Sequence, residues 1–326
     1  FFENNYVLMS WSFDYTGKTS IFIDSSRRVC LVVNIDKFDS QTQLKEALEN
    51  FQKLSKLYFL HLQFLVSVEH ESIEQELIDR WIRILEFFTI HSTKGVDKNE
   101  QFFFSLSLRQ SEYGIFLSLI KKDIKMNLVY FEIGDDRTKA LNRINQADQL
   151  IKGTKKIMYL GLTKCLSHDD IDWILSKTAV NQVKVVNIGE IEIPSLKVRI
   201  IELVHSYGCN TIMNFNHDVI STIQNTEYIK EIAVKYEIPE ELVIMKGLLQ
   251  LGTLICIPYD IGVEKLEVYS RLVHPFVHRR KFVSAFKIIS LEISADDFNK
   301  IINKSEEVEA KEDENWKKHV KSLPQQ

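Results

Sequence analysis

Glycine and proline are scarce in this sequence, which has only 11 glycines and 5 prolines among its 326 residues. The low glycine content argues against phosphate-binding loops, which need glycine for close backbone approach. It also argues against a β-sandwich with many tight turns. The composition favours helices and strands joined by short polar turns instead. At 45% hydrophobic residues, the chain can still fill a substantial core.

Paired cysteines are also missing. The four cysteines, Cys30, Cys165, Cys209 and Cys256, are far apart in the sequence and none forms a CxxC motif. We interpret them as small buried residues in a reducing compartment, which predicts a cytoplasmic protein.

The sequence has no excess of positive charge, because its net charge is −4. This balance argues against a general nucleic-acid or acidic-membrane binder, so neither is expected as a partner. One stretch, residues 242–259, is apolar enough to raise the question of a membrane span. It is barely long enough and it contains Lys246 and Gln250. We predict a buried helix that runs into a strand.

The most informative feature is a short pattern that returns five times in the middle of the chain. Each copy ends in an apolar-x-apolar triplet, and successive copies are 25 to 29 residues apart, at 102–108, 128–133, 156–162, 183–188 and 211–215. The intervening segments have helical periodicity. Similar strand patterns are predicted outside this region, at 28–35, 57–62, 231–236, 265–270 and 288–293.

Helix-capping residues support these units. Ser167, followed by two aspartates, is a predicted N-cap, and Gly208 is a predicted helix end. The acidic pairs Asp135/Asp136 and Asp296/Asp297 follow strand patterns and mark two further helix starts.

A strand and a helix every 25–29 residues predicts an α/β solenoid of the leucine-rich-repeat kind. We therefore expect lead-in strands or a cap over residues 1–27 and a leucine-rich-repeat-like domain over residues 28–304. Residues 305–326 are expected to be a charged tail or helix. Trp316 in that segment is a candidate docking residue.

No catalytic residues, metal site or cofactor are predicted. Cys165, His168, Asp169 and Asp170 are close together, but they suit a helix N-terminus better than a metal site. Nucleophile-elbow, kinase and dinucleotide motifs are all absent from the sequence. We name one cluster the basic patch and treat it as a possible partner-binding feature: His274, His278, Arg279, Arg280 and Lys281.

The exposed sheet face is the expected working surface of such a solenoid. Its residues alternate with the core positions and mix aromatic, amide and acidic side chains, as protein-binding surfaces do. The candidates are Tyr130, Glu132, Tyr159, Val185, Asn187, Asn214, Glu267 and Tyr269.

The repeated units over residues 128–162 and 183–215 resemble the C-terminal regions of two expanded nematode families. These are the F-box-associated FTH-type proteins and the pals proteins, and the similarity extends over residues 28–304. Membership would imply a leucine-rich-repeat-like fold without catalysis. The pals resemblance implies a regulator of the immune and stress response to intracellular pathogens that binds a paralogous repeat protein as a hetero-oligomer.

Two alternatives stay open. The FTH-type resemblance implies a substrate-recognition adaptor that bridges a target to a cullin–RING ubiquitin ligase through a Skp-type adaptor. No F-box helices are recognised before residue 28, so either that module lies upstream of Phe1 or the protein is a repeat-only regulator, and the second option favours the pals resemblance. The third hypothesis is a ligand-dependent or catalytic protein that uses the basic patch.

Overall fold

Eight parallel strands form the centre of the molecule. The computed structural model describes residues 29–34, 42–43, 46, 61–67, 103–108, 117, 126–133, 136–154, 157–163, 167–179, 182–190, 195–214, 226–258 and 293–322. The strands are β1 (Val29–Asn34), β2 (His61–Ser67), β3 (Phe103–Leu108), β4 (Met126–Glu132), β5 (Ile157–Thr163), β6 (Val183–Glu190), β7 (Asn210–Asn214) and β8 (Leu254–Pro258).

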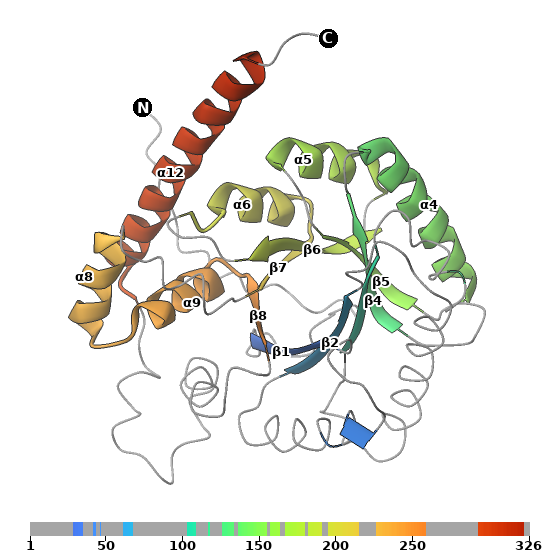
Figure 1. Cartoon of the computed structure of the whole chain (residues 1–326), viewed down its shortest axis with the longest axis horizontal. Coiled ribbons are helices and arrows are strands. Elements are labelled where there is room, and N and C mark those ends of the chain that lie inside the picture. The colour runs from blue at the N-terminus through green and yellow to red at the C-terminus, as the bar shows by residue number, and fades with distance from the viewer. Residues whose placement is uncertain are drawn as a thin grey trace.

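The sheet closes on itself. Each strand pairs in parallel with the next in chain order, and β1 pairs in parallel with β8, which completes a closed barrel (Figure 1). This is the α/β barrel architecture, and the predicted open solenoid is wrong. A solenoid and a barrel are built from the same strand–helix unit, so the 25–29-residue spacing suits both. Only the long-range pairing of β1 with β8 distinguishes them.

Closure explains why the strands are apolar at consecutive positions. In β4, Leu128, Val129, Tyr130 and Phe131 are all buried. Successive side chains point to opposite faces, so one set packs in the barrel lumen and the other packs under the surrounding helices. A solenoid of the kind predicted would leave the first set exposed.

Helices cover the outer face of the sheet. They are α4 (Arg137–Thr154), α5 (His168–Lys177), α6 (Val198–Ser206), α8 (Glu227–Tyr236) and α9 (Glu240–Gln250). Figure 1 shows α4, α5 and α6 following one another around the outside of the strands. Each buries an apolar stripe, such as Ile171, Ile174 and Leu175 in α5.

Several predicted helix ends are confirmed. The Ser167 side chain accepts a hydrogen bond from the Asp170 backbone N–H at 3.1 Å and caps α5. Asp136 Oδ1 accepts from Lys139 N–H at 2.9 Å at the start of α4. Gly208 follows α6 with a left-handed φ of 71°, which glycine adopts without strain.

The predicted strand at 231–236 is wrong, because these residues belong to α8. The apolar-x-apolar triplet there was misleading: Ile232 is 2% exposed whereas Val234 is 79% exposed. The residues that are buried, Ile229, Ile232 and Ala233, have helical spacing instead. By contrast, the predicted helix running into a strand is confirmed as α9 followed by β8.

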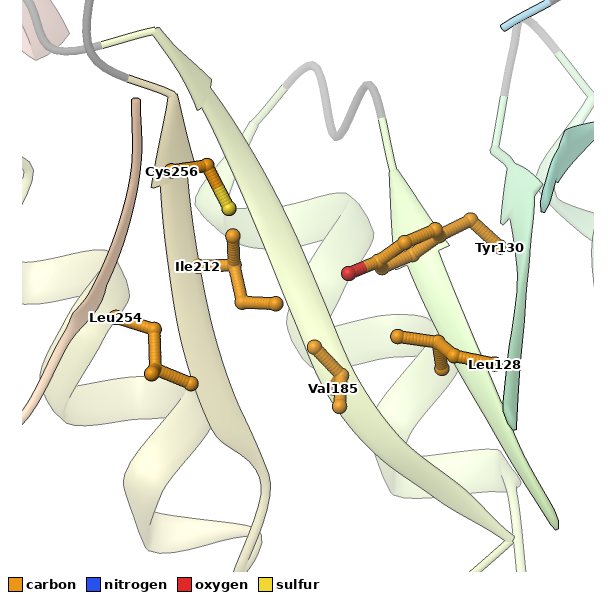
Figure 2. Close-up of a cluster of buried hydrophobic side chains, with 6 residues drawn as sticks. All are labelled: Leu128, Tyr130, Val185, Ile212, Leu254 and Cys256. Atoms are coloured by element: carbon orange, nitrogen blue, oxygen red, sulfur yellow. The ribbon is translucent and has the colours of Figure 1, made fainter. Parts of the chain in front are cut away.

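Small and large side chains interdigitate in the lumen. Figure 2 shows the lumen cluster, formed by Leu128, Tyr130, Val185, Ile212, Leu254 and Cys256. The ring of Tyr130 passes over Gly161 on β5. A Cβ atom at Gly161 would lie 2.7 Å from Tyr130 Cδ1 and 3.0 Å from the Val185 carbonyl oxygen. Gly161 therefore makes room for the largest fully buried side chain described.

A long C-terminal helix, α12 (Ala295–Ser322), packs beside α6 and α8, and its far end extends away from the barrel (Figure 1). It crosses the expected boundary between residues 304 and 305. Its first turn is fixed by Asp297, whose Oδ2 accepts hydrogen bonds from Lys235 Nζ at 2.6 Å, Tyr236 Oη at 2.7 Å and Ser294 Oγ at 2.8 Å. These bonds join α8 to α12.

None of the helices in the described part of the chain is both long and apolar enough to cross a membrane.

Substituting Gly161 tests the packing of the lumen. We expect Gly161→Ala to lower the free energy of unfolding by about 1–3 kcal/mol, since the added methyl group must displace Tyr130 and cannot displace the Val185 carbonyl. Urea unfolding of the full chain measures this change.

The matched control is Gly153→Ala in α4, where an added Cβ has no atom within 4 Å. Here alanine should be neutral or stabilise by up to about 1 kcal/mol, since it favours the helix. Equal effects at the two glycines would contradict the proposed contact with Tyr130.

The Asp297 network predicts a pH dependence. Hydrogen bonds from Lys235 and then Tyr236 lower the pKa of Asp297 to about 2. A carboxyl group with a lowered folded-state pKa stabilises the fold above its unfolded pKa, and this contribution is lost as the pH falls towards about 2. Asp297→Asn should therefore destabilise the chain at pH 7 and change it little near pH 2. Unfolding curves at both pH values test this, and an equal loss at both would contradict it.

Candidate functional site

Polar residues gather at the carboxyl end of the barrel lumen. The last lumen-facing residues of four successive strands are Glu132 on β4, Thr163 on β5, Asn187 on β6 and Asn214 on β7. On each strand, the polar residue follows a lumen residue without a polar side chain or a largely apolar one, two positions earlier on the same face. These preceding residues are Tyr130 after Leu128 on β4, Gly161 on β5, Val185 on β6 and Ile212 on β7. At the carboxyl ends of these four strands, the lumen face thus changes from apolar to polar.

The strand register extends this arrangement to the first three strands. Ser107 on β3 pairs with Tyr130, Ser67 on β2 pairs with Ser107, and Asn34 ends β1. We call the resulting set the mouth ring: Asn34, Ser67, Ser107, Glu132, Thr163, Asn187 and Asn214. Strand β8 differs and ends in Pro258. In barrels of this architecture, the active site lies at the carboxyl end of the strands.

The mouth ring is partly buried. Asn187 is 4% and Thr163 is 7% exposed, whereas Glu132 and Asn214 are more accessible. Glu132 and Thr163 are register partners, which places them side by side on β4 and β5. Apolar residues with a few polar groups above them are the usual composition of a ligand site.

Asn187 shapes the end of β6. Its Oδ1 accepts a hydrogen bond from the Gly189 backbone N–H at 3.0 Å, and Gly189 has a φ of 88°. That left-handed conformation bends the chain after the lumen position. Beyond the bend, Lys197 Nζ donates to the carbonyl oxygens of Ile188 at 3.0 Å and Glu190 at 3.3 Å. The ammonium group is thereby held beside the carboxyl end of β6.

The N-terminus of α6 lies on this side of the barrel and is capped by α12. Glu309 accepts hydrogen bonds from the backbone N–H groups of Val198 at 2.8 Å and Arg199 at 3.2 Å. Its Oε1 also accepts from Ser305 Oγ at 2.9 Å. The residue before the helix, Lys197, has a φ of 53° and makes no side-chain cap. A carboxylate from a distant helix therefore satisfies the first α6 donors.

Negative charge accumulates along the same interface. Burial raises the pKa of Glu202 on α6, and the charges of Glu306 and Glu309 raise it further. Burial also raises the pKa of Tyr159, a lumen residue below the mouth ring. Both shifts favour the neutral form of the side chain.

The residues predicted for an exposed sheet face occupy a different environment. Tyr130 and Val185 are completely buried in the lumen, and Tyr159 packs against the same cluster. Glu132, Asn187 and Asn214 belong to the mouth ring. The predicted surface role assumed a solenoid with an exposed sheet face. In the barrel, that same face of the sheet lines the lumen. Thr163 was missed, although it continues the alternation of Tyr159 and Gly161.

Other predicted residues lie outside the described part: Glu267, Tyr269, the basic patch, and the side chain of Trp316. His168 and Asp169 lie at the start of α5, as the interpretation as a helix N-terminus predicts. Within the ranges that the structure describes, no group of three or more potential ligands could hold a metal ion.

Comparison with known proteins places the fold. No family model matches the sequence, and no curated protein is similar to it in sequence. Among solved structures, a Brucella melitensis aldo/keto reductase has a TM-score of 0.53 and 12% identity, with 85% of this chain and 94% of that chain covered. An aldo-keto reductase of the silkworm Bombyx mori has a TM-score of 0.54 and 12% identity, with 85% and 82% covered.

A third similar structure is a thermostable aldo-keto reductase in complex with the inhibitor epalrestat. Its TM-score is 0.55 at 12% identity, with 85% of this chain and 94% of that chain covered. These similarities confirm the barrel fold, and they overturn the resemblance to the nematode pals and FTH-type families. The non-enzymatic regulator and the ubiquitin-ligase adaptor were both inferred from that resemblance. They are overturned with it, as is the prediction that the chain is not an enzyme.

The expected pairing with a paralogue stays a prediction, because the structure contains one chain.

Removing the Glu309 carboxylate tests the cap on α6. We expect Glu309→Gln to lower the free energy of unfolding by about 1–2 kcal/mol, because an amide NH2 cannot accept from the α6 N–H groups. Chemical unfolding of the full chain measures the loss.

Glu307→Gln is the matched control. Glu307 lies two residues away and contacts exposed Lys304, so its replacement should have no measurable effect. A loss confined to Glu307→Gln would contradict the cap.

Proposed function

We propose that this chain is an oxidoreductase that reduces a small carbonyl compound with NADPH at the mouth ring. The observation that carries the proposal is the part of the ring formed by Glu132, Thr163, Asn187 and Asn214, which follow Tyr130, Gly161, Val185 and Ile212 at the carboxyl ends of four successive strands. Support also comes from the similar fold of aldo-keto reductases, one of which is described in complex with NADPH.

The described ring residues fit the nicotinamide end of this cofactor. Thr163, Asn187 and Asn214 offer neutral donors and acceptors, which is the chemistry that a carboxamide group requires. The lumen residues below them are apolar and suit the face of an aromatic ring. When bound, NADPH supplies a hydride.

Binding the phosphate groups of NADPH requires cationic side chains. Loops after the seventh and eighth strands commonly bind phosphate in barrels of this architecture. The chain leaves β8 at its carboxyl end, and Arg279, Arg280 and Lys281 follow in the sequence before α12. These residues lie outside the described ranges, and we propose them as the phosphate ligands. This assignment retains the hypothesis from the sequence that the basic patch binds a ligand.

Carbonyl reduction also requires a proton for the substrate oxygen. Among the described residues of the ring, Glu132 is the group that can release and regain a proton. Its position at the end of β4, beside Thr163, lets it hydrogen-bond a substrate or a water in the mouth. We propose that Glu132 provides the proton and that Thr163 and Asn214 orient the carbonyl group.

The test uses the full chain with NADPH and a panel of small aldehydes and ketones. Binding is measured by calorimetry and turnover by the loss of reduced nicotinamide absorbance. Glu132→Gln should lower kcat by about 100-fold or more, since general acid–base groups contribute this much. NADPH affinity should change little, because Glu132 does not contact the phosphates in this account.

Glu314→Gln is the control, because Glu314 is exposed on the far part of α12. It should leave both quantities unchanged. Failure of the wild-type chain to bind NADPH would contradict the choice of cofactor. Turnover that survives Glu132→Gln at the wild-type rate would contradict the role of Glu132.

A further inference from the structure

Barrel closure brings together two cysteines from opposite ends of the sequence. Strand β1 pairs with β8 in a parallel register that matches Val29 with Ile255, Cys30 with Cys256 and Leu31 with Ile257. Cys30 and Cys256 are therefore register partners across the seam between the first and the last strand. They are 226 residues apart in the chain, and the sequence gives no sign that they meet.

The register also places the two Cα atoms within the span that disulfides bridge. Neighbouring strands lie about 4.8 Å apart. Disulfides join residues whose Cα atoms are about 4.4–6.8 Å apart. Register partners in adjacent strands lie on the same face of a sheet, and Cys256 belongs to the lumen cluster (Figure 2). Cys30 therefore occupies the lumen-face position opposite Cys256.

The surroundings of Cys209 differ. Its Sγ donates a hydrogen bond to the Val183 carbonyl at 3.3 Å, and it lies just before β7, outside the β1–β8 seam. Burial raises the pKa of the Cys209 thiol to about 11, so this thiol is protonated at neutral pH. Cys209 therefore serves as an internal comparison, a buried thiol without a cysteine register partner.

We propose that Cys30 and Cys256 form a reversible disulfide across the β1–β8 seam when the protein meets a peroxide. Cys256 is the register partner of Asn214 in the mouth ring, so a molecule as small as hydrogen peroxide reaches the pair through the open end or through local opening of the seam. The inference rests on the strand register and is independent of the proposed reductase activity.

The chemistry balances with hydrogen peroxide as the oxidant. One thiol loses its proton, its thiolate attacks a peroxide oxygen, and the O–O bond breaks to give a sulfenic acid and a hydroxide, which takes up the released proton and becomes water. The second thiol then attacks the sulfenic sulfur, the S–S bond forms, and a second water leaves. Two thiols are oxidised to one disulfide, and one peroxide is reduced to two waters. A dithiol reductant reverses the reaction.

The bond would join the first and last strands of the barrel covalently. Linking residues so far apart in the chain restricts the unfolded state, so the oxidised protein should resist unfolding more than the reduced protein. The seam would then be held by a covalent bond as well as by backbone hydrogen bonds.

The experiment treats the folded full chain with hydrogen peroxide, alkylates the remaining thiols and maps the peptides by mass spectrometry without reduction. We expect one cross-linked peptide pair that contains Cys30 and Cys256, and a loss of two of the four thiols. The urea midpoint of the oxidised protein should rise, and dithiothreitol should return it to the starting value.

Two variants and a control make the result decisive. Cys30→Ala and Cys256→Ala should each abolish the cross-link and the shift in the urea midpoint, while Cys209→Ala should keep both. Circular dichroism establishes that each variant is folded, and either of the first two suffices if the other does not fold. Recovery of Cys30 and Cys256 as alkylated thiols after peroxide treatment would overturn the proposal. So would oxidation of Cys256 without a link to Cys30, or a link to Cys165.

Discussion

The pairing of β1 with β8 is the constraint on which the rest of the structure depends. Without those hydrogen bonds, the sheet would have two free edges and an exposed concave face. With them, every strand has two neighbours, and the inner face becomes a packed core. Closure also defines the mouth, because parallel strands all end on the same side. The polar ring, the proposed site of catalysis and the cysteine pair each follow from that one seam.

Much of the local structure could be predicted from the sequence. The strand patterns that became β4 to β7, the cap at Ser167 and the helix-to-strand passage from α9 to β8 all follow from short-range periodicity and capping chemistry. The strand predicted at 231–236 failed because a single apolar-x-apolar triplet fits a helix as well as a strand. The solvent exposure of Val234 shows which periodicity applies there.

Closure could not be predicted in the same way, because it depends on a contact between residues 226 positions apart in the chain. The runs Leu128–Phe131 and Val183–Ile188 did contain a clue. Apolar residues lie on both faces of these strands, which is typical of a parallel sheet covered on both sides. The alternation of side chains along each strand was interpreted as core residues alternating with surface residues. In a barrel, the alternating side chains point either into the lumen or towards the helix layer. Asn187 and Asn214 were therefore selected as candidate residues, but for the outside of an open sheet.

Hydrogen exchange of the β1 and β8 amides, measured by mass spectrometry on the native full chain, tests the closed barrel most directly. The account predicts that both strands exchange as slowly as β5 and β6, because the seam bonds break only when much of the barrel opens. Fast exchange in both terminal strands, with protection only in the middle of the sheet, would show an open sheet with free edges and would contradict closure.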